Sequence, residues 1–468
     1  MINEFVSLVN NILWGDGQVL IIMLLACGIW FTVKLGGVQL RHFGHMFSLL
    51  KGSNTSTKDG ISSFQALCTS LSARVGTGNL AGVAVAISLG GAGAIFWMWM
   101  IALLGMATGF AESVLGQLYK VRDENGEFRG GPAYYIKQGL NKTWLAVAFS
   151  LCLFFGYGFV FSAVQANTIT DALNNAYSFP TEYVGLAIIA LAALIVVGGL
   201  KSIARFAEFV VPFMGIGYVL VALAITFINI SELPAMLLDI VKSAFGLQEA
   251  GAGALGAAIK NGIQRGLYSN EAGSGSVPHA AASAVPNPNH PVSQGYIQML
   301  GGFLDTLVLC TSTAFIILLA GGSSSDQMEG IRLTQDAMSS HLGEGGTDFV
   351  AAAISLFAFT SVVANYAYGE SNLHMFKLDN KIGRAVYTIG YLGMIYWGAQ
   401  AALPQVWAMA DMALGLMTVI NIIAIVWMTP TIVSISKDYF KKKDSGANME
   451  YKAGDCEIQG KSEDGIWD

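Results

Sequence analysis

The sequence predicts an all-α polytopic membrane protein of eleven transmembrane helices, in which one peripheral N-terminal helix precedes two halves of five helices each. Three observations predict this fold. Hydrophobic residues make up 54% of the 468 residues and charged residues only 12%, about half the share of a soluble domain. Eleven segments are apolar over roughly the 20 residues that a bilayer requires. Two of these segments are interrupted by glycine and polar residues at matching places.

The expected spans follow from the apolar runs in chain order. They are 17–36, 62–89, 93–119, 144–172, 182–199, 206–230, 252–284, 293–320, 348–376, 382–402 and 404–430. The predicted organisation is a peripheral helix with its cytoplasmic loop over 1–61, a first five-helix repeat over 62–230, an extracellular connector over 231–251, a second repeat over 252–430 and a cytoplasmic tail over 431–468. The tail is charged from Ser436 onward, and we expect it to be flexible.

The distribution of charge predicts orientation and excludes several classes of protein. One set of loops and the tail hold 19 Lys and Arg residues, whereas the opposite loops hold only Lys242 and Arg332. The positive-inside rule therefore predicts a cytoplasmic C-terminus and, with eleven spans, an external N-terminus. The net charge of −6 provides no basic surface for nucleic acid, and five scattered cysteines form no zinc motif. We expect a multi-pass protein of a bacterial inner membrane.

The second and seventh spans are interrupted by the same pattern. The second reads RVGTGNLAG over 74–82 and the seventh reads RGLYSNEAG over 265–273, so both place Arg, Asn and Ala-Gly at the same spacing. Each interrupted span opens a half of five helices, and an odd number inverts the second half relative to the first. Broken helices at equivalent places of an inverted repeat indicate the midplane binding site of a secondary transporter. Small residues also serve plain helix packing, but intramembrane Asn79, Asn270 and Glu271 favour function.

A broken helix exposes backbone groups that can bind ions. Free amides at the new N-terminus suit a carboxylate, and free carbonyls at the new C-terminus suit a hard cation such as sodium. We therefore expect an anionic group at the amides of Gly76, Thr77, Gly78 and Asn79. We expect a cation at the carbonyls of Ala73 and Gly76 and the hydroxyls of Thr360 and Ser361. For the two hydroxyls the alternative is a bond to their own helix.

Other polar groups within the spans have less specific interpretations. Gln165, in the fourth span, suits a zwitterionic ligand or a hydrogen bond between helices. Arg74 or Arg265 is expected to find a carboxylate partner such as Glu271. Glu112 and Asp305 are candidates for a proton relay.

Four motifs in chain order resemble the alanine or glycine:cation (sodium) symporter family, the amino acid carrier branch of the LeuT-fold (APC) superfamily. They are VGTGNLAG over 75–82, FRGGPAYYI over 128–136, RGLYSNEAGSGS over 265–276, and FAFTS over 357–361 with NYAYGE over 365–370. The resemblance covers about residues 60–430. It implies a LeuT-type 5+5 inverted repeat and uptake of small neutral amino acids coupled to sodium, sometimes to protons, without an organic cofactor.

The resemblance also implies roles for single residues. Gly76–Asn79 corresponds to the element that binds the substrate carboxylate, and Gln165, Tyr268 and Ala272 to the substrate pocket. Ala73, Gly76, Thr360 and Ser361 correspond to the sodium site. Asn365 stands where relatives selective for alanine and glycine often carry tryptophan. A larger, more polar pocket would then accept glutamine.

The resulting prediction is a sodium-coupled symporter of small neutral amino acids that works by alternating access, with alanine and glycine as the first candidates and glutamine or serine as further ones. A proton-coupled symporter or an exchanger of the same substrates is the alternative within transport. A membrane-embedded enzyme is the alternative of another class, and the spans hold no HExxH or GxSxG motif to support it. The expected partners are the amino acid, sodium and the lipid bilayer, with no nucleic acid. A single chain is taken as the functional unit.

Overall fold

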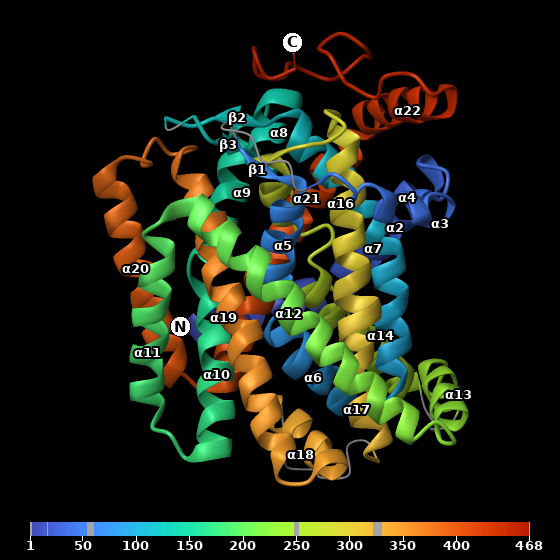
Figure 1. Ribbon diagram of the computed structural model, residues 1–468, viewed down its shortest axis with the longest axis vertical. Helices are drawn as coiled ribbons and strands as arrows, with labels where there is room; N and C mark the ends of the chain where they lie inside the picture. The colour runs from blue at the N-terminus through green and yellow to red at the C-terminus, as the bar shows by residue number, and fades with distance from the viewer. Residues whose placement is uncertain are drawn as a thin grey trace.

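The computed structural model describes residues 2–15, 17–53, 60–124, 126–247, 252–321 and 330–467, and most of them are helical (Figure 1). The first half contains α1 (Ile2–Trp14), α2 (Val19–Lys34), α3 (Val38–Arg41), α4 (Phe43–Ser48), α5 (Ser63–Arg74), the π-helix η1 (Gly78–Gly82), α6 (Val83–Gly90), α7 (Gly93–Leu118), α8 (Pro132–Gly139), α9 (Thr143–Phe155), the π-helix η2 (Gly156–Val160), α10 (Phe161–Tyr177), α11 (Thr181–Val196) and α12 (Gly199–Ile228). The second half contains α13 (Leu233–Ala244), α14 (Ala252–Asn270), α15 (Val277–Ser283), α16 (Pro291–Gly302), the π-helix η3 (Phe303–Cys310), α17 (Thr311–Leu319), α18 (Ile331–Leu342), α19 (Gly345–Leu373), α20 (Lys381–Gln400), α21 (Leu403–Trp427) and α22 (Thr429–Ser445).

Six described helices are long and apolar enough to cross a membrane, and the bent pair α1–α2 adds a seventh. The six are 93–118, 143–177, 199–228, 291–319, 345–373 and 403–427, and each overlaps a predicted span. The other predicted spans correspond to shorter or broken helices: α2, α5 with α6, α11, α14 with α15, and α20. The chain is therefore a multi-pass membrane protein.

The broken helices lie at the centre of the bundle. α14 and α15 pack against α7, and α5 packs against α12 and α19. In Figure 1, α5 and α6 lie behind α12, between α19 on one side and α14 on the other. This placement surrounds both interruptions with protein, as irregular backbone at membrane depth requires.

Four two-residue strands that the sequence did not predict close one end of the bundle. β1 (Ile61–Ser62) pairs in parallel with β4 (Ala284–Val285), and β2 (Val121–Arg122) pairs antiparallel with β3 (Phe128–Arg129). The β1–β4 pair joins the start of α5 to the end of α15, so the two broken helices are tied together at this end. α5 then begins with a capping box between Ser62 and Gln65.

The described part of the tail is ordered, which corrects the expectation of a flexible segment. α22 continues to Ser445, and the chain then folds back over the end of the bundle at the top of Figure 1. Trp467 is 2% exposed, and its Nε1 donates to the carbonyl of Leu118 at 3.1 Å. The ammonium of Lys120 lies 4.9 Å from the Trp467 ring, and burial lowers the pKa of Lys120 to about 7. Aromatic anchors outweigh the charged composition that predicted flexibility.

Candidate functional site

The first interruption is short and is held by neutral side chains. α5 ends at Arg74, Val75 leaves the helical conformation, and η1 begins at Gly78. The amide of Gly76 donates to Asn79 Oδ1 at 2.9 Å. The amide and the hydroxyl of Thr77 both donate to Gln165 Oε1, at 2.9 and 2.8 Å. Two of the four amides predicted to bind an anion, those of Gly76 and Thr77, thus bond to carboxamide oxygens, whereas the amide of Asn79 donates to the carbonyl of Gly76 at 3.2 Å.

The second interruption is longer and is held by a carboxylate. Glu271, Gly273 and Gly275 adopt positive φ angles of 57°, 90° and 84°, which end α14 at Asn270. The amides of Gly273 and Gly275 donate to the two oxygens of Glu112, at 3.1 and 3.2 Å.

The same carboxylate joins a third helix to this interruption. Asn421 Nδ2 of α21 donates to Glu112 Oε2 at 2.7 Å and to the carbonyl of Gly273 at 3.0 Å. Sequence analysis named Glu112 as a proton-relay candidate; the structure shows it as the acceptor that fixes the backbone of the second interruption.

Oxygen atoms gather where α5 ends against α19. The hydroxyl oxygen of Ser361 lies 2.9 Å from the carbonyl of Ser72, 3.3 Å from that of Val75 and 3.2 Å from that of Phe357. A hydroxyl has one proton, so acceptors outnumber donors in this cluster. The carbonyls that the first interruption and the end of α5 bring to Ser361 belong to Ser72 and Val75, each one residue before the predicted pair Ala73 and Gly76.

The hydroxyl of Thr360 makes a hydrogen bond within its own helix, which was the alternative to a cation ligand. Its hydroxyl donates to the carbonyl of Phe357 in its own helix at 2.8 Å, while its carbonyl accepts from Ser72 Oγ at 2.8 Å. Its backbone therefore contacts α5, and its hydroxyl does not.

Gly76 lies between the oxygen atoms around Ser361 and the side chain of Gln165. A Cβ atom on Gly76 would overlap Ser361 Oγ and lie 2.7 Å from Gln165 Oε1, so any larger residue would have to displace these two side chains. Gly78 lies against α14, since a Cβ there would be 3.2 Å from the Cα of Ser269 and from Tyr268 Cδ1. The glycines of the first interruption thus permit three helices to approach one point.

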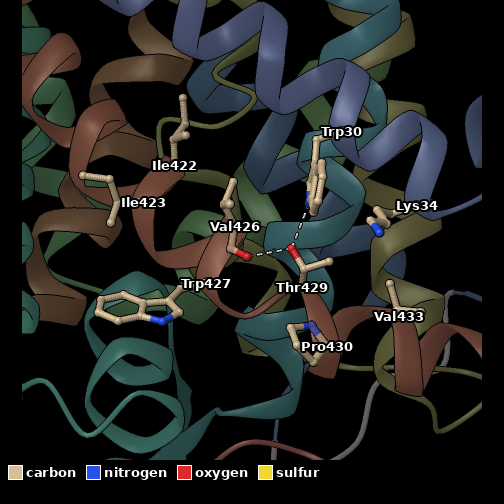
Figure 2. Close-up of a pocket in the computed structure, with 9 residues that line it drawn as sticks. All are labelled: Trp30, Lys34, Ile422, Ile423, Val426, Trp427, Thr429, Pro430 and Val433. Carbon is tan, nitrogen blue, oxygen red and sulfur yellow. Dashed lines mark hydrogen bonds between the residues drawn. The ribbon is translucent and has the colours of Figure 1, made fainter.

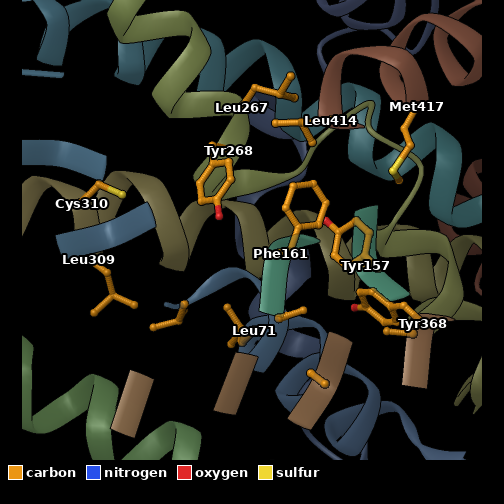
Figure 3. Packing of buried hydrophobic residues seen from close by; sticks show 14 of the residues in the cluster. Leu71, Tyr157, Phe161, Leu267, Tyr268, Leu309, Cys310, Tyr368, Leu414 and Met417 are labelled. Atoms are coloured by element: carbon orange, nitrogen blue, oxygen red, sulfur yellow. The ribbon is translucent and has the colours of Figure 1, made fainter. Parts of the chain in front are cut away.

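Two cavities differ in position and in character. One is an open groove of about 780 Å³ beside Trp30 and Trp427, and none of its lining residues belongs to either interruption (Figure 2). A narrow central cavity lies between the interruptions, and Figure 3 shows four of the side chains that line it, those of Tyr157, Phe161, Tyr268 and Leu414. It is lined by Ala73, Arg74, Tyr157, Phe161, Gln165, Tyr268, Glu271, Asn365 and Leu414. It has about 10 Å³ for solvent, room for one water molecule, so the lining side chains must separate before an amino acid can bind.

The structure brings four predicted residues together around this cavity, namely Ala73, Gln165, Tyr268 and Asn365. Asn365 is 1% exposed, and its Oδ1 has no hydrogen-bond partner among the described residues. Ala272 instead packs against α7, with its Cβ about 3.0 Å from where a Cβ on Gly105 would lie.

Aromatic rings line the cavity and continue beyond it, and Figure 3 shows the row from Tyr268 through Phe161 and Tyr157 to Tyr368. Tyr268 packs against Phe161 with ring centroids 5.8 Å apart, Phe161 against Tyr157 at 4.6 Å, and Tyr157 against Tyr368 at 5.4 Å. On the other side Tyr268 contacts Trp407 at 4.8 Å. Tyr157, Phe161 and Leu414 were missed in the sequence because an aromatic or leucine within a span is equally typical of packing.

A buried carboxylate lies beside the first interruption. Asp305 accepts hydrogen bonds from Asn79 Nδ2 at 2.7 Å, Ser269 Oγ at 2.6 Å and Thr306 Oγ1 at 2.8 Å. Asn79 Nδ2 can only donate, whereas the two hydroxyls can donate or accept, so this environment suits both protonation states of Asp305.

The two matching arginines were expected to find a carboxylate partner such as Glu271, and the structure gives them other partners. Arg265 Nη2 pairs with Asp411 Oδ2 at 2.6 Å rather than with Glu271. Arg74 Nη1 donates to the carbonyl of Gln298 at 3.2 Å. Glu271 Oε2 accepts from Ser276 Oγ at 2.7 Å.

Comparison with known proteins identifies the family. A model of the sodium:alanine symporter family matches residues 1–453. The probable sodium/glutamine symporter GlnT of Bacillus subtilis is 46% identical over 447 residues, which cover 95% of this chain and 92% of that protein. The amino-acid carrier protein AlsT of Bacillus subtilis is 43% identical over 451 residues, covering 96% and 95% of the two chains. The sodium/alanine symporter AgcS of Methanococcus maripaludis is 37% identical over 449 residues, covering 93% and 97%. With a match over nearly its whole length, the chain belongs to the sodium:alanine symporter family, a family of transporters.

Proposed function

We propose that the chain is a sodium-coupled symporter of small neutral amino acids that works by alternating access. Its eleven spans would form a peripheral helix and a LeuT-type 5+5 inverted repeat, with the N-terminus outside and the C-terminus in the cytoplasm of a bacterial inner membrane. The family match and the relatives named sodium/glutamine and sodium/alanine symporters support the coupling ion and the class of substrate.

The first interruption is the better site for the substrate carboxylate. Its amides at Gly76 and Thr77 bond to the neutral oxygens of Asn79 and Gln165, which a carboxylate can replace with a stronger, charge-assisted bond. The amides of the second interruption already bond to the carboxylate of Glu112. A second anion there would have to compete with a covalently attached one.

Sodium would bind in the oxygen cluster of α5 and α19. The carbonyls of Ser72 and Val75 and the hydroxyl oxygen of Ser361 present more acceptors than donors, and hard cations prefer oxygen ligands. The predicted ligands Ala73, Gly76 and Thr360 border this cluster. Both solutes would then meet at Gly76, which contacts Ser361 and Gln165. This convergence carries the proposal, because two solutes that stabilise one closed state become coupled.

Asn365 would distinguish among substrates. Asn365 lines the central cavity, and its Oδ1, which has no hydrogen-bond partner in the described part of the chain, would offer an acceptor to a polar side chain such as that of glutamine or serine. Replacing Asn365 by tryptophan should lower glutamine transport more than alanine or glycine transport. An equal loss for all three would contradict this role.

The test is uptake of labelled alanine, glycine and glutamine into proteoliposomes under a sodium gradient or a proton gradient. We expect sodium to drive uptake. Ser361→Ala should raise the sodium concentration for half-maximal uptake about tenfold, equal to about 1.4 kcal/mol. Ser355→Ala is the matched control, because Ser355 donates to the carbonyl of Ala351 in its own helix.

Uptake driven only by protons would overturn sodium coupling and direct attention to the buried carboxylates. Uptake under neither gradient would contradict the substrate class.

A further inference from the structure

The open groove lies between the peripheral helix α2 and the junction of α21 with α22 (Figure 2). Its volume of about 780 Å³ is far larger than that of the central cavity. Trp30 Nε1 donates to Thr429 Oγ1 at 3.0 Å, and this bond fixes α2 to the start of α22 across the base of the groove. The groove is therefore built by three helices held in register.

The walls of the groove are apolar and face outward. Trp30, Ile423 and Trp427 are 42%, 45% and 55% exposed. Tryptophan gathers at the interface between the hydrocarbon and the headgroups of a bilayer. Two exposed tryptophans beside an exposed isoleucine indicate that hydrocarbon chains enter the groove at the level of the headgroups.

The rim of the groove is cationic. Lys34 is the last residue of α2, and its ammonium lies 4.6 Å from the centre of the Trp30 ring. Val433 of α22 lines the groove, and exposed Lys437 follows it one helical turn later on the same face. No residue that lines the groove is acidic.

Asp438, the acidic residue next to Lys437 in α22, pairs with other residues. Asp438 lies 2.8 Å from the ammonium of Lys442 and 3.2 Å from Nε2 of His290. His290 Nδ1 accepts from the amide of Val292, and burial lowers the pKa of His290 to about 4. The positive charges of Lys34 and Lys437 are therefore left for an external anion.

We propose that this groove is a binding site for one anionic phospholipid. The acyl chains lie along α21 between Trp30 and Trp427, and the phosphate lies between Lys34 and Lys437. Basic pockets between transmembrane helices on the cytoplasmic side bind anionic headgroups in this way. The bound lipid links α2, which lies outside the two repeats, to α22 and the tail. This inference does not depend on the transported substrate.

The test compares binding of phosphatidylglycerol and phosphatidylcholine with identical acyl chains to the purified full chain in detergent, by native mass spectrometry. Two lysines contribute about 1 kcal/mol each toward an anionic headgroup, so we expect roughly 30-fold tighter binding of phosphatidylglycerol. The double variant Lys34→Gln, Lys437→Gln should reduce this preference to about twofold or less. Lys381→Gln, an exposed lysine at the start of α20, is the matched control and should keep it.

A second variant tests the apolar part of the groove. Val433→Trp fills the space between α21 and α22 without changing charge, so it should weaken binding of both lipids by a similar factor. Size-exclusion chromatography and thermal unfolding check that each variant is folded. Equal binding of the two lipids by the unaltered chain would overturn the proposal. An equal loss of preference in the double variant and in Lys381→Gln would also overturn it, since general surface charge would then explain the preference.

Discussion

The two interrupted helices share a sequence pattern but are stabilised by different chemistry. In both, the asparagine caps its own interruption: Asn79 Oδ1 accepts from the amide of Gly76, and Asn270 Oδ1 from the amide of Ala272. The other contacts differ, because the amide of Thr77 in the first interruption bonds to the neutral carboxamide of Gln165, and the amides of Gly273 and Gly275 in the second bond to the carboxylate of Glu112. A repeated motif therefore fixes where a helix breaks, while its surroundings decide what the break can bind.

This difference indicates that the two interruptions have different roles in transport. Bonds to Gln165 can be exchanged for a ligand, whereas bonds to buried Glu112 involve a charge that is costly to leave unpaired. We infer that the first interruption exchanges partners during transport and that the second is a fixed joint. Four experiments test this division, in order of the expected effect.

The largest effect is expected from Glu112→Ala. The variant leaves the amides of Gly273 and Gly275 and the side chain of Asn421 without an acceptor, at about 1–3 kcal/mol each. Transport should fall more than about 100-fold and the thermal midpoint should fall with it. Glu112→Gln keeps one carbonyl acceptor and should retain part of both. Near-normal uptake by Glu112→Ala would mean that the second interruption needs no fixed partner.

The next largest effect is a difference in stability between variants of the two matching arginines, Arg265 and Arg74. Arg265→Met leaves Asp411 without its partner and should destabilise the protein by about 3–5 kcal/mol, because an unpaired buried charge is costly. Arg74 makes no ion pair within 4.0 Å among the described residues and donates to the carbonyl of Gln298, so Arg74→Met should cost less, about 1–3 kcal/mol. Thermal unfolding in detergent measures both. Adding Asp411→Asn to Arg265→Met should recover stability, and equal losses in the two single variants would contradict the distinction.

Sequence patterns predicted the interruptions but not these partners. Glycine, asparagine and arginine within apolar runs placed the interruptions in 62–89 and 252–284, where the structure has them. Glu112 and Asp411 lie 161 and 146 residues from the groups that they bind, and no local periodicity encodes such a distance. The tail was misjudged for the same reason, since the contact of Trp467 with Leu118 spans 349 residues.

The two asparagines provide the third comparison. Asn79 caps Gly76 and also donates to the carboxylate of Asp305, whereas Asn270 Nδ2 has no partner among the described residues. Asn79→Ala should therefore lower uptake about 30-fold, corresponding to about 2 kcal/mol, and Asn270→Ala about fivefold, corresponding to about 1 kcal/mol. Initial uptake rates at several alanine concentrations measure both. A larger loss in Asn270→Ala would reverse the assignment of the two interruptions.

The smallest effect gives the most direct test of the division. Gln165→Glu places a carboxylate at the first interruption, where the amide and hydroxyl of Thr77 would bind it as Gly273 and Gly275 bind Glu112. A fixed carboxylate competes with the substrate carboxylate, so the substrate concentration for half-maximal uptake should rise about tenfold, or about 1.4 kcal/mol. Gln165→Met is the control, because it removes the acceptor without adding charge and should change this concentration less. If both variants behave alike, the amides of Gly76 and Thr77 do not bind the substrate carboxylate, and the two interruptions differ in structure without differing in role.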